Sequence, residues 1–142
     1  MANSDVISSR FAFALLLLRV AVAVVFLYHG SAILFGAFGG PGPVAFAGLM
    51  HAPVIIGYLV GLAQFAGGIA VLTGIFYRLG AVCLMIVMLG AMFLVHLPHG
   101  FNVAKGGYEF AMTEFFMVFA LLLTGPGPWS LNCWLPPSLR GL

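Results

Sequence analysis

The sequence predicts one all-α integral membrane domain, residues 1–142, with four transmembrane helices packed as a bundle. Three observations carry this prediction: 63% of the 142 residues are hydrophobic, only 6% are charged, and the mean hydropathy is +1.20. A soluble domain carries roughly 25% charged residues, which form its water-facing surface. The composition therefore argues against a soluble enzyme, a nucleic-acid-binding protein and a disordered chain.

Four apolar blocks approach the length of about 20 residues that a helix needs to cross a bilayer. A Gly/Pro-rich loop follows the first block, and its apolar stretch from Val44 to Met50 predicts a short helix. Arg19 interrupts the apolar run of the first block, so we interpret that block as a retained helix rather than a cleaved signal peptide. Proline after Thr124 ends the fourth block, because proline lacks a backbone donor. The predicted spans are residues 11–35, 54–76, 79–97 and 108–124, with an interfacial tail over 125–142.

The distribution of Lys and Arg predicts how the chain is oriented. Four spans place both termini on the same side of the membrane. That side holds Arg10, Arg78 and Arg140, whereas the other side holds Lys105 alone. We therefore expect cytoplasmic termini and a multi-pass protein of a bacterial-type cytoplasmic (inner) membrane.

Most of the other ionisable side chains fall in the outer half of the predicted bundle. Arg19 and Glu114 both lie within the membrane, at depths that differ by roughly 8 Å. An intramembrane charge is costly and usually faces a partner, so we expect an Arg19–Glu114 contact, with Glu109 as the less favoured partner. The pair would act in chemistry or only as an assembly clamp, and both interpretations stay open. The candidate ligand-binding residues are Arg19, His29, Gln64, His96, Glu109 and Glu114.

Small residues gather on the second span. Gly57, Gly61 and Gly68 fall with Gln64 within an arc of about 60°, and Gly67 lies beside them. Small residues at this spacing let helix backbones approach closely, so we expect these glycines to mediate helix packing. Gln64 would point into that contact, where it would form a structural inter-helix hydrogen bond, or one to Arg19 or to a ligand carbonyl.

The sequence contains no motif for an intrinsic metal or redox cofactor. His29 and His96 form the one plausible axial pair for haem. Met85 and Met92 share the predicted face of His96, with Met88 to one side, but methionine more often fills packing gaps, so haem is not expected. A zinc or copper site made from His96, His99 and Glu109 matches no recognised ligand spacing.

The predicted bundle can enclose a cavity in its outer half. An apolar cavity with a few convergent polar groups is the usual form of a ligand site. A lipid-soluble quinone suits it, because the ring needs apolar walls, the carbonyl oxygens need donors and the redox chemistry needs a proton acceptor. Without a cofactor motif of its own, the chain would require a redox partner. The cavity would contain Arg19, His29, Gln64, His96 and Glu114, walled by Phe26, Phe65, Phe115 and Met92.

Several short motifs occur in a characteristic order: Leu18-Arg19 before Tyr28-His29-Gly30, then Gln64-Phe65-Ala66-Gly67-Gly68, then Gly107-Tyr108-Glu109, then Thr124-Gly125-Pro126-Gly127. With them the chain resembles the DoxX family of small four-helix membrane proteins, over about Leu18 to Leu131. The resemblance implies a link to membrane oxidoreductases. Some members resemble or form membrane subunits of thiosulfate:quinone oxidoreductase, and others are accessory or maturation factors. Gln64 stands where the family commonly has Glu, so Glu114 would have to serve in any proton transfer.

Three functions of different classes follow from these observations. The first is a membrane subunit or anchor of a respiratory-type oxidoreductase with a quinone-facing cavity. The second is a non-enzymatic structural or assembly subunit that docks onto a larger membrane complex through its small-residue faces. The third is a small-solute transporter or channel, which would require a homo-oligomer. The expected partners are the lipid bilayer and a further membrane protein, redox subunit or copy of the chain, and not nucleic acid.

Overall fold

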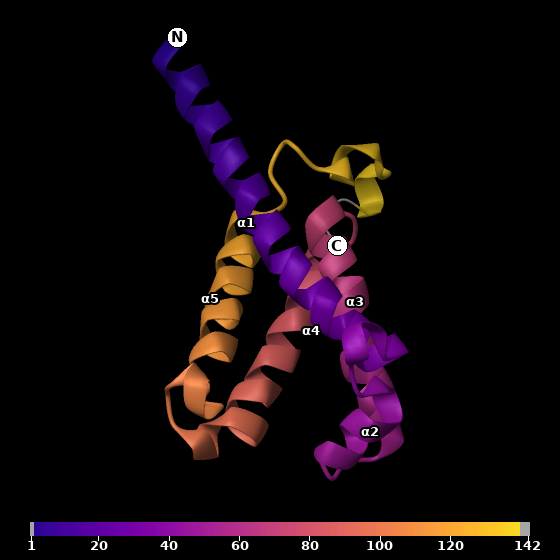
Figure 1. Cartoon of the computed structure of the whole chain (residues 1–142). Coiled ribbons are helices and arrows are strands. Elements are labelled where there is room, and N and C mark those ends of the chain that lie inside the picture. Colours follow the sequence, from indigo (N-terminus) through magenta and orange to yellow (C-terminus); the bar gives the residue numbers. More distant parts are fainter. Residues whose placement is uncertain (1, 140–142) are drawn as a thin grey trace.

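The computed structural model describes residues 2–139, and over that range it contains helices and turns but no strand (Figure 1). Among these residues, three helical segments are long and apolar enough to cross a membrane: Ser8–Phe35, Val54–Thr73 and Tyr77–His99. The prediction of an all-helical membrane fold is therefore confirmed. Arg140, which contributes to the predicted orientation, lies outside the described residues. The α-helices are α1 (Ala2–Phe35), α2 (Gly42–Leu49), α3 (Val54–Thr73), α4 (Tyr77–Gly90) and α5 (Glu109–Thr124).

Two helix ends differ from the predicted ones. α3 ends at Thr73 rather than at residue 76, because Gly74 adopts a left-handed conformation (φ 82°) and its N–H donates to Ala70 O at 2.8 Å. Glycine has no Cβ, so it takes this conformation without strain and terminates the helix. α1 begins at Ala2, well before residue 11. α2 confirms the short helix expected in the first loop.

The four long helices form a ring in which each contacts two neighbours. α1 packs against α3, α3 against α4, α4 against α5, and α5 against α1. α1 crosses the others obliquely, and its N-terminal turns extend beyond them (Figure 1). α2 and residues 97–108 lie at one end of the bundle, which we call the loop end. Residues 125–139 lie at the opposite end, which we call the tail end.

The core of the bundle is apolar, and so is most of its outer surface. Phe26, Val71, Leu84 and Leu121, one from each long helix, are at most 1% exposed. Large apolar side chains are also exposed around the bundle, among them Leu94 at 78%. Lipid chains are as apolar as leucine, so a membrane covers such a surface without cost.

Glycines let α1 and α3 approach closely. A Cβ built on Gly30 of α1 would lie 2.5 Å from the backbone nitrogen of Phe65 on α3. On the facing side, a Cβ on Gly61 would lie 3.1 Å from Leu34 N, and one on Gly68 would meet the side chain of a leucine of α1. These backbones are therefore in contact over several turns, which is the packing that small residues permit.

The other two predicted packing glycines face different neighbours. A Cβ on Gly57 would collide with the carbonyl oxygen of Pro43, at the start of α2. A Cβ on Gly67 would lie 2.8 Å from the side chain of Leu84 on α4. All four glycines of α3 thus pack inside this chain, so the small-residue face is not available for docking onto another membrane protein.

Adding one methyl group at the α1–α3 contact should destabilise the protein. We expect Gly30→Ala to lower the free energy of unfolding by about 1–3 kcal/mol, because the new Cβ overpacks against backbone atoms that cannot yield. Gly48→Ala on α2 is the matched control, since no atom lies within 4 Å of the position that its new methyl group would take. Thermal unfolding of the purified protein in detergent checks both variants. Equal unfolding temperatures for the two would contradict the packing argument.

Candidate functional site

A cavity of about 580 Å³ lies in the loop-end half of the bundle. Residues from α1, α3, α5, the α2 region, and α4 with its continuation line it. Four of them are polar, namely His29, Gln64, His96 and Glu114, and the other lining side chains are apolar. The cavity therefore combines apolar walls with a few convergent polar groups, as ligand sites do.

The cavity brings together four of the six candidate residues that the sequence suggested. Arg19 and Glu109 do not line it. Phe26 is part of its wall, but Phe65, Phe115 and Met92 are not. Helix periodicity placed the polar side chains on facing surfaces, whereas the individual apolar neighbours depend on helix rotation.

Glu114 is the polar side chain of the cavity that lacks a hydrogen-bond partner for one of its oxygens. It lies on α5, is only 3% exposed, and its Oε2 atom has no hydrogen-bond partner. Among residues 8–139, whose side chains the structure describes, no other buried side-chain nitrogen or oxygen lacks a partner. An unsatisfied buried polar atom costs about 1–3 kcal/mol. A ligand that forms a hydrogen bond with this carboxyl group would remove that cost.

α4 changes its helical form where it borders the cavity. After Gly90 the chain continues as a π-helix over Ala91–His96. A π turn holds about one residue more than an α turn, so the segment rotates His96 back by about 100°. His96 therefore lies in the same cavity wall as Met88. The sequence had instead predicted that it shares a helix face with Met85 and Met92. Such π segments are frequent at functional sites.

Sequence reasoning did not foresee this π segment, because it follows no periodic pattern of apolar residues. One signal was present. Pro98 lies two residues after the end of the segment and has no N–H to donate to the carbonyl group of Leu94, four residues earlier. The loss of that hydrogen bond weakens the last α turn and favours a helical turn of a different type.

The two histidines of the cavity are held differently. His96 Nδ1 lies 2.6 Å from the carbonyl oxygen of Gly106, which ties the end of α4 to the loop before α5. His29 is exposed on α1, and its ring lies 6.3 Å from that of Phe110 and 5.4 Å from that of Tyr28. His96 therefore has a fixed orientation, whereas the placement of His29 rests on ring contacts.

Glu109 stabilises the loop rather than the cavity. Its Oε2 accepts a hydrogen bond of 3.1 Å from Val103 N, and the Asn102 side chain accepts one of 2.9 Å from Ala104 N. In the part of the chain that the structure describes, no three His, Cys, Asp or Glu side chains gather closely enough to hold a metal ion.

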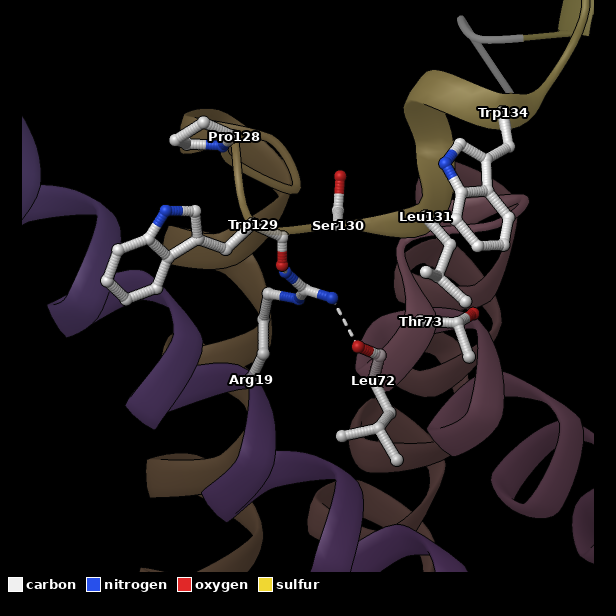
Figure 2. Close-up of a pocket in the computed structure, with 8 residues that line it drawn as sticks. All are labelled: Arg19, Leu72, Thr73, Pro128, Trp129, Ser130, Leu131 and Trp134. Carbon is white, nitrogen blue, oxygen red and sulfur yellow. Dashed lines mark hydrogen bonds between the residues drawn. The ribbon is translucent and has the colours of Figure 1, made fainter.

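Arg19 lies at the tail end, where it is 1% exposed (Figure 2). Its Nε donates to Val71 O at 2.8 Å, and its Nη2 donates to Leu72 O at the end of α3. Its Nη1 donates to Pro126 O at 2.8 Å and to Trp129 O at 2.9 Å. One guanidinium group thus joins α1, the last turn of α3 and the tail.

The predicted Arg19–Glu114 contact is therefore wrong. The two side chains belong to opposite ends of the bundle, and no ion pair joins them. The last carbonyl groups of a helix have no partner within the helix, and the helix dipole makes that end negative. These carbonyl groups of α3 satisfy Arg19, an arrangement that an estimate of depth alone does not reveal.

A second hollow, of about 480 Å³, adjoins Arg19 between α3 and the tail (Figure 2). Its two hydroxyl groups are already engaged: Thr73 Oγ1 donates to Ile69 O, and Ser130 Oγ donates to Gly127 O. Because Arg19 also donates to four carbonyl groups, this hollow has little left with which to bind a ligand. The loop-end cavity is the stronger candidate site.

Similarity to known proteins identifies the family of the chain. The DoxX family profile matches residues 14–97, more than half of its length. The chain belongs to the DoxX family. The matched segment runs from α1 through the π segment, so it includes His29, Gln64 and His96 but not Glu114.

Two relatives of this DoxX protein illustrate the range of its similarity. It is 28% identical to CatD of Bacillus subtilis (strain 168), whose name provisionally describes an oxidoreductase, over 83% of this chain and 84% of CatD. It is 32% identical to Rv3486 of Mycobacterium tuberculosis (strain ATCC 25618 / H37Rv), which is named as an uncharacterized membrane protein, over 81% of this chain and 77% of Rv3486. No solved structure gives a significant match.

Removing the Arg19 guanidinium should release the tail. We expect Arg19→Gln to lower the free energy of unfolding by about 3 kcal/mol, because the shorter amide cannot satisfy the four carbonyl groups that Arg19 contacts. Chymotrypsin should then cleave near Trp129 and Trp134 at least tenfold faster, as followed by mass spectrometry. Arg78→Gln, a change at an exposed position of α4, is the control. A tail equally resistant in both variants would contradict the role of Arg19.

Proposed function

We propose that this DoxX protein is a membrane subunit, or anchor, of a quinone-linked respiratory-type oxidoreductase, and that its loop-end cavity holds the quinone ring. The observation that carries the proposal is the buried Glu114 carboxyl group, which has an unpartnered oxygen in a mostly apolar cavity. The provisional name of CatD supports the reaction class.

The donors of the cavity suit the two oxygens of a quinone. Gln64 carries an amide NH₂, His29 carries a ring N–H, and a protonated Glu114 carries an O–H. The volume of about 580 Å³ falls within the usual range of ligand pockets. A carboxyl group beside a reducible ring can also supply or take up the proton that quinone chemistry requires.

The electrons would be exchanged with another protein. The chain has two cysteines, whereas an iron–sulfur cluster commonly needs four thiolates. Its sequence also lacks a nucleotide-binding or flavin-binding fingerprint. The proposed role is therefore to bind the quinone within the membrane and to associate with a redox subunit that carries the electrons.

The orientation is part of the proposal. In it α5 is the fourth span, since its 16 residues extend about 24 Å. Arg10 and Arg78 belong to the tail end, whereas Lys105 belongs to the loop end. The positive-inside rule then places both termini in the cytoplasm and the cavity in the outer half of a cytoplasmic membrane.

Labelling of single cysteines tests this orientation. In a chain carrying Cys83→Ser and Cys133→Ser, we expect Lys105→Cys to react with a membrane-impermeant maleimide in intact spheroplasts. Ser138→Cys should react only after lysis, because the tail end faces the cytoplasm. The reverse pattern, or equal reaction of both positions in intact spheroplasts, would contradict the orientation.

Purification in mild detergent tests the ligand. Mass spectrometry of an organic extract should detect about one quinone per chain, and Glu114→Leu should retain less than a tenth of it, because the buried hydrogen-bonding group is lost. Glu109→Gln is the control, since its amide oxygen can still accept from Val103 N and residue 109 does not line the cavity. An absorption spectrum of the same sample reports any bound haem. Absence of quinone and of a redox-active partner across several mild detergents would refute the proposal.

The role of a purely structural assembly subunit has less support. That alternative relied on a free face of small residues, but Gly61 and Gly68 pack against α1 of the same chain. An assembly role also leaves the unpartnered oxygen of Glu114 without an explanation.

A further inference from the structure

The hydrogen bond of His96 determines which of its ring nitrogens can meet a ligand. Its Nδ1 lies 2.6 Å from Gly106 O, and a carbonyl oxygen can only accept a hydrogen bond. Nδ1 must therefore carry a hydrogen atom. In the neutral ring, Nε2 is then the nitrogen with the lone pair, and it acts only as an acceptor.

The loop that supplies this carbonyl group is itself fixed. Gly106 adopts a left-handed conformation (φ 80°), and its N–H donates to Val103 O at 2.9 Å. Gly107 N donates to Asn102 O at 2.9 Å, and a Cβ on Gly107 would collide with the backbone of Gly100. The fold therefore sets the direction of the Gly106 carbonyl, and with it the tautomer of His96.

We propose that His96 Nε2 is the dedicated hydrogen-bond acceptor of the cavity, and that the cavity consequently prefers a hydroxyl-bearing aromatic ring, a quinol, over the corresponding quinone. This inference rests on the proposed function and specifies the form of the ligand. A quinol hydroxyl donates a hydrogen bond to Nε2, whereas a quinone oxygen presents only lone pairs to it.

The other polar groups of the cavity do not oppose this preference. The amide of Gln64 contains both a donor and an acceptor, and a carboxyl group such as Glu114 can donate or accept according to its protonation. The ring of His29 can present a donor or an acceptor according to its tautomer, because only ring contacts hold it. These side chains adapt to either form of the ring. The backbone fixes only His96 as a hydrogen-bond acceptor, so His96 is the side chain that distinguishes a quinol from a quinone.

Binding of both redox forms of one probe tests the inference. Tetramethyl-1,4-benzoquinone and its hydroquinone would be equilibrated anaerobically with the purified full-length protein, and bound probe would be measured by equilibrium dialysis. Wild-type protein should bind the hydroquinone about tenfold more tightly than the quinone. His96→Asn keeps a side-chain N–H for Gly106 but removes Nε2, so it should weaken hydroquinone binding about tenfold and quinone binding less than twofold.

His99→Asn is the matched control. His99 Nδ1 also faces a backbone carbonyl, Val95 O at 3.2 Å, but His99 does not line the cavity. Its substitution should leave both affinities unchanged. Equal binding of the two probe forms by wild-type protein, or equal weakening of both by His96→Asn, would overturn the inference while leaving the proposed function intact. Binding of neither form would overturn the proposed function as well.

Nitrogen-15 spectra of histidine-labelled protein provide a readout that is independent of affinity. The resonances that disappear in His96→Asn should show a protonated Nδ1 and an unprotonated Nε2. The opposite tautomer would overturn the inference even if the quinol were preferred.

Discussion

The buried guanidinium group of Arg19 holds the tail end of the bundle together. It is bonded to carbonyl oxygens of two chain segments that lie more than fifty residues apart, and it comes from a third. Because the negative end of α3 already favours a cation, the charge needs no carboxylate beside it. This arrangement leaves Glu114 without a basic partner and leaves the opposite end of the bundle free to contain a cavity.

The two ends of the bundle therefore have different roles. At the tail end, the backbone satisfies the polar side chains, and Tyr77 adds a hydrogen bond of 3.0 Å to Leu121 O, between α4 and α5. At the loop end, one buried carboxyl oxygen stays unsatisfied, and the wall of the cavity includes a helical segment of irregular form. The paired polar groups of the tail end stabilise the fold, whereas ligand binding is expected at the loop end, where a polar group has no partner.

The sequence predicted most of this arrangement from simple periodicities. Long apolar blocks located the helices, and the 100° step between helical residues placed Gln64 and Glu114 facing the interior. The partner of Arg19 could not be predicted, because its acceptors are backbone atoms brought close by the chain reversal after α5. The rotation of His96 also escaped prediction, since a π segment breaks the very period on which such a prediction depends.

The length of α1 has a consequence for the whole bundle. Its 34 residues extend about 51 Å, well beyond the hydrocarbon layer of about 30 Å. A helix longer than the bilayer responds by tilting, and α1 runs obliquely, in contact with α5 but diverging from it toward the loop end (Figure 1). The cavity lies at that end, where side chains of α1 and α5 line it together with those of α3, α4 and the α2 region. A change in the angle between α1 and the other helices would therefore change the room that the cavity offers a ligand.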